Sequence, residues 1–367
     1  MGSSCGKSQS MTTTALPLGA AGLLRRAASW ISTPLLPEDF LGLIDPLWSA
    51  RQLCGRVEAV EPESRGAATV RLRPGRGWQP HRAGQYVRVG VELGGVRHWR
   101  TYSLTCPEGR DDGLVTFTVK DVGLVSGHLV HRTVPGDVLL LDVPQGEFVL
   151  PLVPGPLLFV TGGSGITPVM GMLRTLAGRD ALRDVVLLHS AVDKGDVCFA
   201  AELGALAAAH EGFALTVRLT DTEGLLSFTE LDELVPDWRN RGAWVCGPGG
   251  MLDAAEKHYA DLGLRDALRV ERFRPALLAE PGEGGAVEFV RTGRLVEANG
   301  TTSLLDAGEA AGVVMPSGCR MGICFGCVLP LKAGKVRDLR TGEVHGDEGD
   351  FVQTCISAAA GPVEIDV

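Results

Sequence analysis

The chain has 367 residues, of which 45% are hydrophobic and 22% charged, and its formal net charge at pH 7 is −9. This length exceeds what a single hydrophobic core supports, so two or three domains are expected. The acidic balance, without a long basic run, argues against nonspecific nucleic-acid binding, and no apolar stretch reaches the length of a transmembrane helix.

Residues 1–50 are interpreted as a leader followed by short helices. Residues 1–10 complete neither a myristoylation signal nor a phosphate loop, and we assign them no structure. From Leu16 to Trp48 the sequence is apolar with helix-like spacing but interrupted by prolines, which predicts short helices packed on the next domain. A peripheral contact with the inner face of a membrane is an alternative for this segment, although only two basic residues flank its apolar face.

The next two segments differ in their apolar period. Residues 51–153 contain short strand signals separated by Gly- or Pro-rich turns, which predicts an antiparallel β-barrel. Residues 154–275 contain continuous apolar runs, such as "PLLFVTG" and "DVVLLHSA", that alternate with helix-length segments. This alternation predicts an α/β doubly wound domain with buried parallel strands.

A third domain follows a predicted linker. Residues 276–285 include most of the stretch "AEPGEGGA" (279–286), which is typical of a flexible connection. Residues 286–367 then begin with two strand signals, "AVEFV" and "RLVEANG". The chain has nine cysteines, an odd number clustered toward this end. That distribution favours a reducing cytoplasm over a disulfide framework.

The cysteines of the third domain have the spacing of a metal cluster. Cys319, Cys324 and Cys327 form C-x4-C-x2-C, and Cys355 stands further along. This is the plant-type [2Fe–2S] ligand pattern, in which one tight loop supplies three thiolates. Structural zinc is the weaker interpretation because it usually pairs C-x2-C with a second such pair or with two histidines. The four cysteines are therefore the predicted cluster ligands.

Two motifs of the barrel segment suit a flavin. "RTYS", residues 100–103, ends a predicted strand: Arg100 suits a pyrophosphate, Tyr102 offers a flat face to an isoalloxazine ring, and Ser103 is placed to bond flavin N5. "GLVS", residues 123–126, is a turn in which Ser126 is predicted to cap a helix whose free N–H groups suit a phosphate.

A nicotinamide dinucleotide is predicted for the α/β domain. In "TGGSGITP" the glycines at 162, 163 and 165 let the backbone approach a pyrophosphate, and Thr167 is predicted to cap the following helix. Pro168 takes the place of the last glycine in the usual dinucleotide fingerprint, so this is not a conventional Rossmann motif. Cys246, in "CGPGGM", ends a later strand and is expected to face the ligand crevice.

Together these motifs resemble the ferredoxin–NADP reductase superfamily, in the branch with a C-terminal plant-type ferredoxin domain. The resemblance covers roughly Leu53 to Val367 and includes "RTYS", "GLVS", "TGGSGITP", "CGPGGM" and the cysteine pattern. "PLLPEDFLGLIDPLWSARQL", "HRAGQYVRVGV" and "HWRTYSLT" resemble actinobacterial reductases that serve membrane di-iron acyl-CoA desaturases.

The resemblance implies a β-grasp fold for the third domain and a set of site residues. Ser103 and Cys246 are the implied catalytic residues. The implied cofactor-binding residues are Arg100, Thr101, Tyr102, Ser103, Gly123, Leu124, Val125, Ser126, Gly162, Gly163, Ser164, Gly165, Thr167, Cys246, Gly247 and Phe273. The implied cofactors are FAD, a [2Fe–2S] cluster and NAD(P)H, although one relative group with this domain order uses FMN.

NADPH is slightly favoured over NADH as the donor, mainly through the resemblance. Lys194 or Arg218 would bind its 2′-phosphate, whereas Asp193 would instead hold a ribose hydroxyl. Electrons would then pass from NAD(P)H through FAD and the cluster to an oxygen-activating partner, most plausibly a membrane di-iron fatty acyl desaturase. The alternatives are a hydroxylase, a Rieske oxygenase or a cytochrome P450 as acceptor, a redox-sensing binding protein, and a zinc-stapled nucleotide-binding module.

Overall fold

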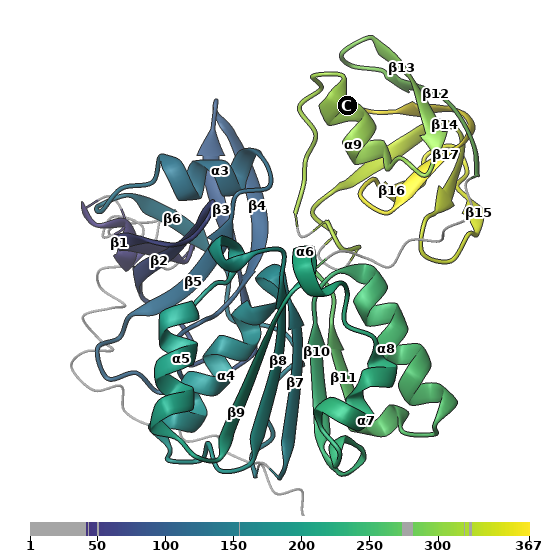
Figure 1. Ribbon diagram of the computed structural model, residues 1–367. Coiled ribbons are helices and arrows are strands. Elements are labelled where there is room, and N and C mark those ends of the chain that lie inside the picture. Colours follow the sequence, from purple (N-terminus) through teal and green to yellow (C-terminus); the bar gives the residue numbers. More distant parts are fainter. Residues whose placement is uncertain are drawn as a thin grey trace, which may run out of the picture.

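The computed structural model describes residues 42, 44–49, 51–153, 155–273, 282–318, 320–322 and 325–367. Three β-sheets follow one another along the chain (Figure 1). The predicted multidomain fold is confirmed: an antiparallel sheet, a parallel sheet and a smaller mixed sheet. Most of the predicted N-terminal leader and short helices, and the alternative of a membrane contact there, lie outside the described residues. In the described part of the chain, no helix is both long and apolar enough to cross a membrane.

The first sheet is a closed barrel of six antiparallel strands in the order β4-β3-β6-β1-β2-β5. An isolated bridge between Leu104 and Phe117 joins the ends of β4 and β5 and closes it. The apolar side chains of alternate positions, among them Val70, Leu72 and Phe117, form its core. The elements are β1 (Cys54–Ser64), β2 (Ala67–Pro74), β3 (Tyr86–Leu93), β4 (Val96–Ser103), β5 (Val115–Lys120), α3 (Leu124–His131) and β6 (Val138–Leu141).

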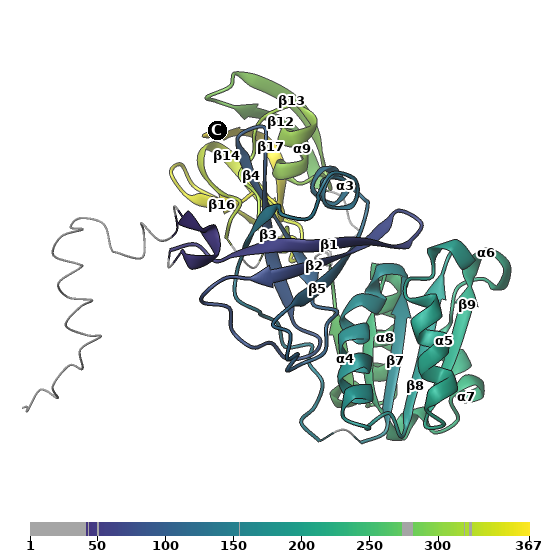
Figure 2. The same ribbon diagram turned by 90° about the vertical axis from the view of Figure 1, so that its left-hand side faces the viewer.

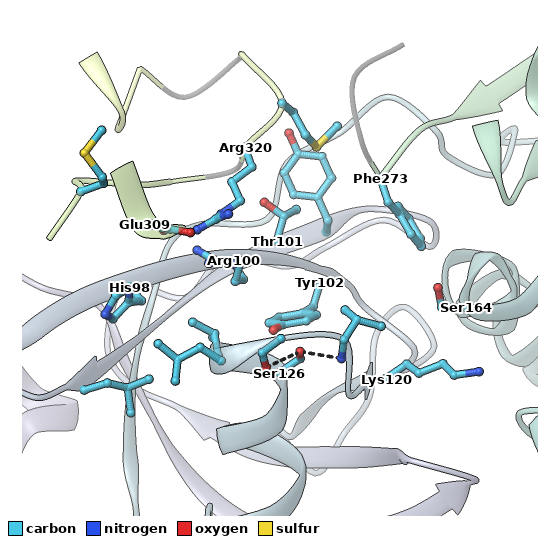
Figure 3. Close-up of a pocket in the computed structure, with 18 of the residues that line it drawn as sticks. His98, Arg100, Thr101, Tyr102, Lys120, Ser126, Ser164, Phe273, Glu309 and Arg320 are labelled. Carbon is cyan, nitrogen blue, oxygen red and sulfur yellow. Dashed lines mark hydrogen bonds and ion pairs between the residues drawn. The ribbon is translucent and has the colours of Figure 1, made fainter. Parts of the chain in front are cut away.

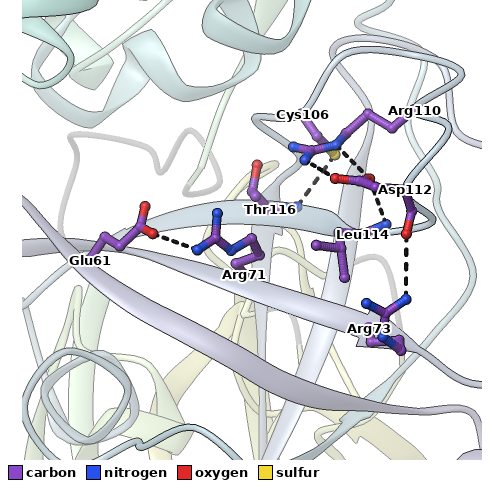
Figure 4. Close-up of polar contacts among 8 residues, drawn as sticks. All are labelled: Glu61, Arg71, Arg73, Cys106, Arg110, Asp112, Leu114 and Thr116. Atoms are coloured by element: carbon purple, nitrogen blue, oxygen red, sulfur yellow. Dashed lines mark hydrogen bonds and ion pairs between the residues drawn. The ribbon is translucent and has the colours of Figure 1, made fainter.

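The loop between β4 and β5 is fixed by polar contacts (Figure 4). Arg110 Nε donates to Asp112 Oδ1 at 2.9 Å, and Arg73 Nη1 donates to the Asp112 carbonyl at 3.4 Å. Inside the loop, the Thr116 N–H donates to the buried Cys106 sulfur at 3.4 Å. These contacts hold the end of β4 in place, which is where the motif "RTYS" stands.

The second sheet is parallel, in the order β11-β10-β7-β8-β9, with helices packed on both faces (Figure 2). β7 and β8 are largely buried apolar runs, as their sequences predicted, and all six residues of β7 are buried, whereas β9 and β11 are more exposed. The elements are β7 (Leu157–Gly162), α4 (Ile166–Gly178), β8 (Val185–Ala191), α5 (Ala200–Ala209), β9 (Phe213–Leu219), α6 (Thr220–Glu223), α7 (Leu231–Leu234), β10 (Gly242–Cys246), α8 (Gly249–Asp261) and β11 (Leu268–Glu271).

The barrel is joined to this domain by ion pairs beside the β1–β2 turn. Arg65 contacts Asp193 at 2.7 Å, and Lys120 contacts Asp196 at 3.1 Å. The Phe199 N–H donates to the Glu63 carboxylate at 2.7 Å, also across the junction. These contacts place the end of β5 near the carboxyl ends of the parallel strands.

The third sheet has the path β13-β12-β17-β14-β15, and β16 pairs with β14. β12 and β17 are parallel, whereas the other pairs are antiparallel. β12 begins at Gly282, so it starts inside the segment predicted as a linker, residues 276–285; the domain boundaries otherwise remain a prediction. The elements are β12 (Gly282–Phe289), β13 (Arg294–Gly300), α9 (Leu304–Ala310), β14 (Val328–Asp338), β15 (Val344–His345), β16 (Phe351–Gln353) and β17 (Ser357–Ile365).

Candidate functional site

A cavity of about 840 Å³ lies where the barrel, the parallel-sheet domain and the third domain meet (Figure 3). It contains most of the predicted flavin residues, together with side chains from the other two domains. The predicted residues that line it are Arg100, Thr101, Tyr102, Ser103, Gly123, Leu124, Val125, Ser126, Ser164, Thr167 and Phe273. Gly162, Gly163, Gly165, Cys246 and Gly247 are not part of its wall.

The end of β4 contributes four consecutive residues, Arg100 to Ser103, to the wall of this cavity. Tyr102 stacks on Phe117 with ring centroids 5.2 Å apart and 14° between the planes. Phe117 covers one face of the phenol, so the other face is the one open to the cavity, and burial raises the Tyr102 pKa. The Thr101 hydroxyl is buried and has no hydrogen-bond partner among the described residues. A buried hydroxyl without a partner is typical of a binding site, where a ligand forms the missing hydrogen bond.

The turn before α3 is pinned by Ser126. Its hydroxyl accepts the Val122 N–H at 3.0 Å and donates to the Gly123 carbonyl at 3.0 Å. Ser126 therefore does not cap the helix as predicted, because it is the third residue of α3 and its hydroxyl closes the preceding turn. The first N–H groups of α3 receive no side-chain cap at Gly123 and stand at the cavity wall.

The glycine loop of the parallel-sheet domain packs against the loop after β10. A Cβ at Gly165 would lie 2.1 Å from the Cys246 carbonyl oxygen, so this glycine is required for loop packing. The predicted cap by Thr167 is wrong, because Thr167 lies inside α4 and its hydroxyl donates to the Ser164 carbonyl at 3.0 Å.

Cys246 does not face the cavity as expected. Its side chain is fully buried between β7 and β11, and burial raises the pKa of its thiol well above the usual value. The packed thiol is therefore the neutral form. Its predicted place beside a nicotinamide stays a prediction.

The cluster loop is described in part, since Cys319 and Cys324 lie outside the described residues. Cys327 and Cys355 are buried, and the hydrogen bond between their side chains lowers the Cys327 pKa. Arg320 and Phe325 both have left-handed backbone conformations, with φ of 57° and 55°. Strained residues of this kind persist where a tight loop wraps a functional group.

The same loop forms part of the cavity wall. Arg320 and Met321, which follow Cys319, line the cavity with Val313 to Met315. Arg320 is held by Glu309 and, at 3.2 Å, by Asp306. Arg100 lies opposite and donates to Ser317 at 3.4 Å. The predicted cysteine loop and the motif "RTYS" therefore belong to one site.

The guanidinium of Arg100 is half-buried and lies near the carboxylate of Glu309 (Figure 3). Among the described residues, no carboxylate forms an ion pair with it, and its other hydrogen bond goes to the Trp99 carbonyl at 2.8 Å. Burial, and then the nearby charge of Arg320, lower the Arg100 pKa. A half-buried cation of this kind is stabilised by an anionic ligand.

Comparisons with known proteins agree with this geometry. Residues 159–257 match the model of the oxidoreductase NAD-binding domain, and residues 289–360 match that of the 2Fe-2S iron-sulfur cluster binding domain. An "NADPH oxidoreductase" of Mycobacterium tuberculosis is 50% identical over 350 residues, which cover 94% of this chain and 92% of the relative. The ferredoxin reductase component of a 3-ketosteroid-9-alpha-monooxygenase from the same species (strain CDC 1551 / Oshkosh) is 32% identical and covers 65% of this chain and 70% of its own. The chain belongs to the ferredoxin reductase-type oxidoreductases.

This ferredoxin reductase-type protein also shares its fold with phthalate dioxygenase reductase. That structure superposes with a TM-score of 0.61 at 22% identity and covers 86% of this chain and 98% of its own. The two matched domain models are those of a nicotinamide-dinucleotide domain and a [2Fe–2S] domain. The residues fit an anionic cofactor and a cluster, because the cavity holds Arg100 without an ion-pair partner among the described residues and the third domain holds two buried cysteines.

Some residues of the reductase site were missed by sequence reasoning. Glu271 ends β11 and lines the cavity, and burial raises its pKa to about 7. Lys120 lines the cavity from the end of β5. His98, Glu309 and Arg320 form a polar side of the cavity with Arg100 (Figure 3). The position of Glu271 at the end of a strand could have indicated a site residue. No local sequence pattern indicated Glu309 or Arg320.

Proposed function

We propose that this oxidoreductase takes electrons from NADPH and delivers them singly, through its [2Fe–2S] domain, to an oxygen-activating partner protein. One observation carries the proposal: the loop with three of the four predicted ligand cysteines shares a cavity with "RTYS" and with the carboxyl end of the parallel sheet. Three redox groups would then meet at one place, without large domain movements.

The order of electron flow follows from the chemistry of the cofactors. A bound flavin accepts two electrons with a hydride and releases them one at a time, which connects a nicotinamide to a one-electron cluster. The cluster ligands would be Cys319, Cys324, Cys327 and Cys355.

The side chains of the protein would position the flavin ring and neutralise the charge of its pyrophosphate. Arg100 would neutralise the flavin pyrophosphate, and the open face of Tyr102 would support the isoalloxazine ring. The Ser103 hydroxyl, buried at the end of β4, would orient the reactive edge of the ring. Phe273 lies on the opposite side of the cavity and would cover the ring until the nicotinamide arrives. The nucleotide would bind along the 162–167 loop and Gly247.

NADPH is the proposed donor. The most extensive relative reported above is called an NADPH oxidoreductase, and Lys194 is exposed just beyond β8 without an ion pair among the described residues. The other predicted phosphate ligand is engaged, because Arg218 binds Glu230. Asp193 is likewise engaged by Arg65, which weakens its proposed role toward a ribose.

For the partner we propose a membrane di-iron fatty acyl desaturase. The support is the resemblance of "PLLPEDFLGLIDPLWSARQL" and "HRAGQYVRVGV" to desaturase reductases, although most of the first segment lies outside the described residues. The second candidate is a hydroxylating oxygenase, which the name of the 3-ketosteroid-9-alpha-monooxygenase component favours.

Reconstitution tests both candidates. The purified protein is combined with NADPH and either a desaturase in lipid vesicles or a hydroxylating oxygenase, and product is measured against NADPH consumed. Coupled product formation with the desaturase supports the first partner, and with the hydroxylase alone the second. Rapid reduction of ferricyanide but of neither partner would refute electron delivery to these classes.

A further inference from the structure

The cavity extends well past the flavin-ring residues. In Figure 3, His98, Arg100, Glu309 and Arg320 lie on one side of Tyr102, whereas Phe273 and Ser164 lie on the other. The volume of about 840 Å³ is near the upper end of the range for small-molecule sites, about 300–1,000 Å³. The part beyond Arg100 is therefore space that an isoalloxazine ring stacked on Tyr102 leaves open.

The [2Fe–2S] domain presents an exposed apolar side chain to this cavity. After α9 the chain turns at Gly312, whose φ is 76°, and the Val313 N–H bonds the Gly308 carbonyl at 2.9 Å. Val313 and Met315 are buried in the domain's own core, whereas Val314 between them is 61% exposed and lines the cavity. Val314 is therefore not part of the hydrophobic core of this domain, and packing within the domain does not explain why this position is apolar.

The barrel contributes a similar surface to the same cavity. Val122 and Leu124, at the start of α3, are 71% and 68% exposed and line it. Apolar side chains exposed by two domains toward one concave space are typical of a site for a flat apolar ring.

Polar groups line the same cavity beside Tyr102 (Figure 3). Arg100 has no carboxylate partner among the described residues and suits a phosphate. Glu309 is held beside it by Arg320, which also contacts Asp306 at 3.2 Å. A carboxylate fixed in this way accepts hydrogen bonds from ribose hydroxyls, as acidic residues do in dinucleotide sites.

We propose that the adenosine half of FAD lies in the part of the cavity beyond Arg100, with Val314 and Glu309 of the [2Fe–2S] domain as its second wall. The adenine lies between Val314 and Leu124, the ribose hydroxyls face Glu309, and the pyrophosphate faces Arg100. This inference rests on the flavin site of the proposed function. Because FMN has no adenosine, the contacts with Val314 and Glu309 would make the [2Fe–2S] domain the part of the protein that selects FAD over FMN.

Flavin titrations of the full-length protein test the assignment. Flavin is removed, and binding of FAD and of FMN is followed by flavin fluorescence in the wild type and in three variants. Val314→Asp and Glu309→Gln alter the proposed wall. Val344→Asp is the matched control, because Val344 is 55% exposed on the same domain and lies outside the cavity lining. Circular dichroism and cluster absorbance confirm that each variant folds.

The wild type is expected to bind FAD more tightly than FMN. Val314→Asp should weaken FAD binding by about tenfold, equivalent to about 1.4 kcal/mol, and leave FMN binding within about twofold. Glu309→Gln should also weaken the binding of FAD but not that of FMN. Val344→Asp should change the binding of neither flavin. Equal losses for both flavins, or unchanged FAD binding in both wall variants, would overturn the inference. A wild type that binds FMN as tightly as FAD also refutes it while leaving the proposed function intact; binding of neither flavin refutes that function itself.

Discussion

Glu271 gives the protein a pH-dependent stability that one substitution should remove. This glutamate ends β11 opposite Cys246, and burial raises its pKa from 4.5 to about 7. In the unfolded chain the carboxyl ionises near its ordinary pKa, whereas in the folded protein it keeps its proton until about pH 7. The contribution of Glu271 to the free energy of unfolding is therefore greatest below pH 4.5. It falls as the pH rises from 4.5 to about 7 and is constant above pH 7.

The size of the effect follows from the shift. A difference of about 2.5 units at about 1.4 kcal/mol each gives about 3 kcal/mol between the two limits. Glu271→Gln cannot ionise, so above pH 7 it should stabilise the parallel-sheet domain by up to about 3 kcal/mol. For a domain of this size that corresponds to a rise in Tm of about 10 °C.

Scanning calorimetry of flavin-free, nucleotide-free protein at pH 5 and pH 8 measures this. The Tm advantage of Glu271→Gln should be large at pH 8 and small at pH 5. Glu211→Gln should change the Tm little at either pH, because Glu211 is exposed on the same domain and forms no ion pair among the described residues. If Glu271→Gln were no more stable than the wild type at pH 8, the assignment of a buried, protonated carboxyl would be wrong.

Three further predictions concern the redox groups and the loops that hold them. Arg100→Ala removes the half-buried cation, so FAD should bind at least about tenfold more weakly, measured as flavin absorbance per protein; full flavin occupancy would contradict this. Gly165→Ala places a Cβ 2.1 Å from the Cys246 carbonyl oxygen and should destabilise the parallel-sheet domain by about 3 kcal/mol in calorimetry. Gly249→Ala, which meets no atom within 4 Å, is its control, and equal stabilities would count against the packing argument. Cys324→Ser should remove the cluster absorbance and electron delivery while NADPH–ferricyanide activity stays nearly intact, and loss of both activities in a folded protein would refute the division of labour.

The fold was accessible from the sequence because each domain has its own apolar period. The alternating residues of β1 to β6 and the continuous runs of β7 and β8 predicted an antiparallel and a parallel sheet, and both are present. The motif "RTYS" was predicted to end a strand, and β4 ends at Ser103; its role toward a flavin stays a prediction.

The side chains that meet across domains were not predictable in this way. Glu309 and Arg320 reach the cavity only because the third domain packs against β4, and no local pattern encodes that packing. Ser126 and Thr167 have residue types that favour helix caps, but each lies inside its helix and bonds the preceding turn instead. Cys246 follows the rule for strand ends, yet its side chain packs in the core of the parallel-sheet domain and does not line the cavity.

The position of β17 affects how the iron is acquired. This strand is inserted between β12 and β14, both of which precede it in the sequence. The ribosome must therefore release residues 357–365 before the sheet around the cysteines can assemble, whereas the barrel and the parallel-sheet domain can fold during translation. Insertion of the cluster would then be a late step of maturation. A protein without its cluster would already have the folded barrel that binds the flavin ring.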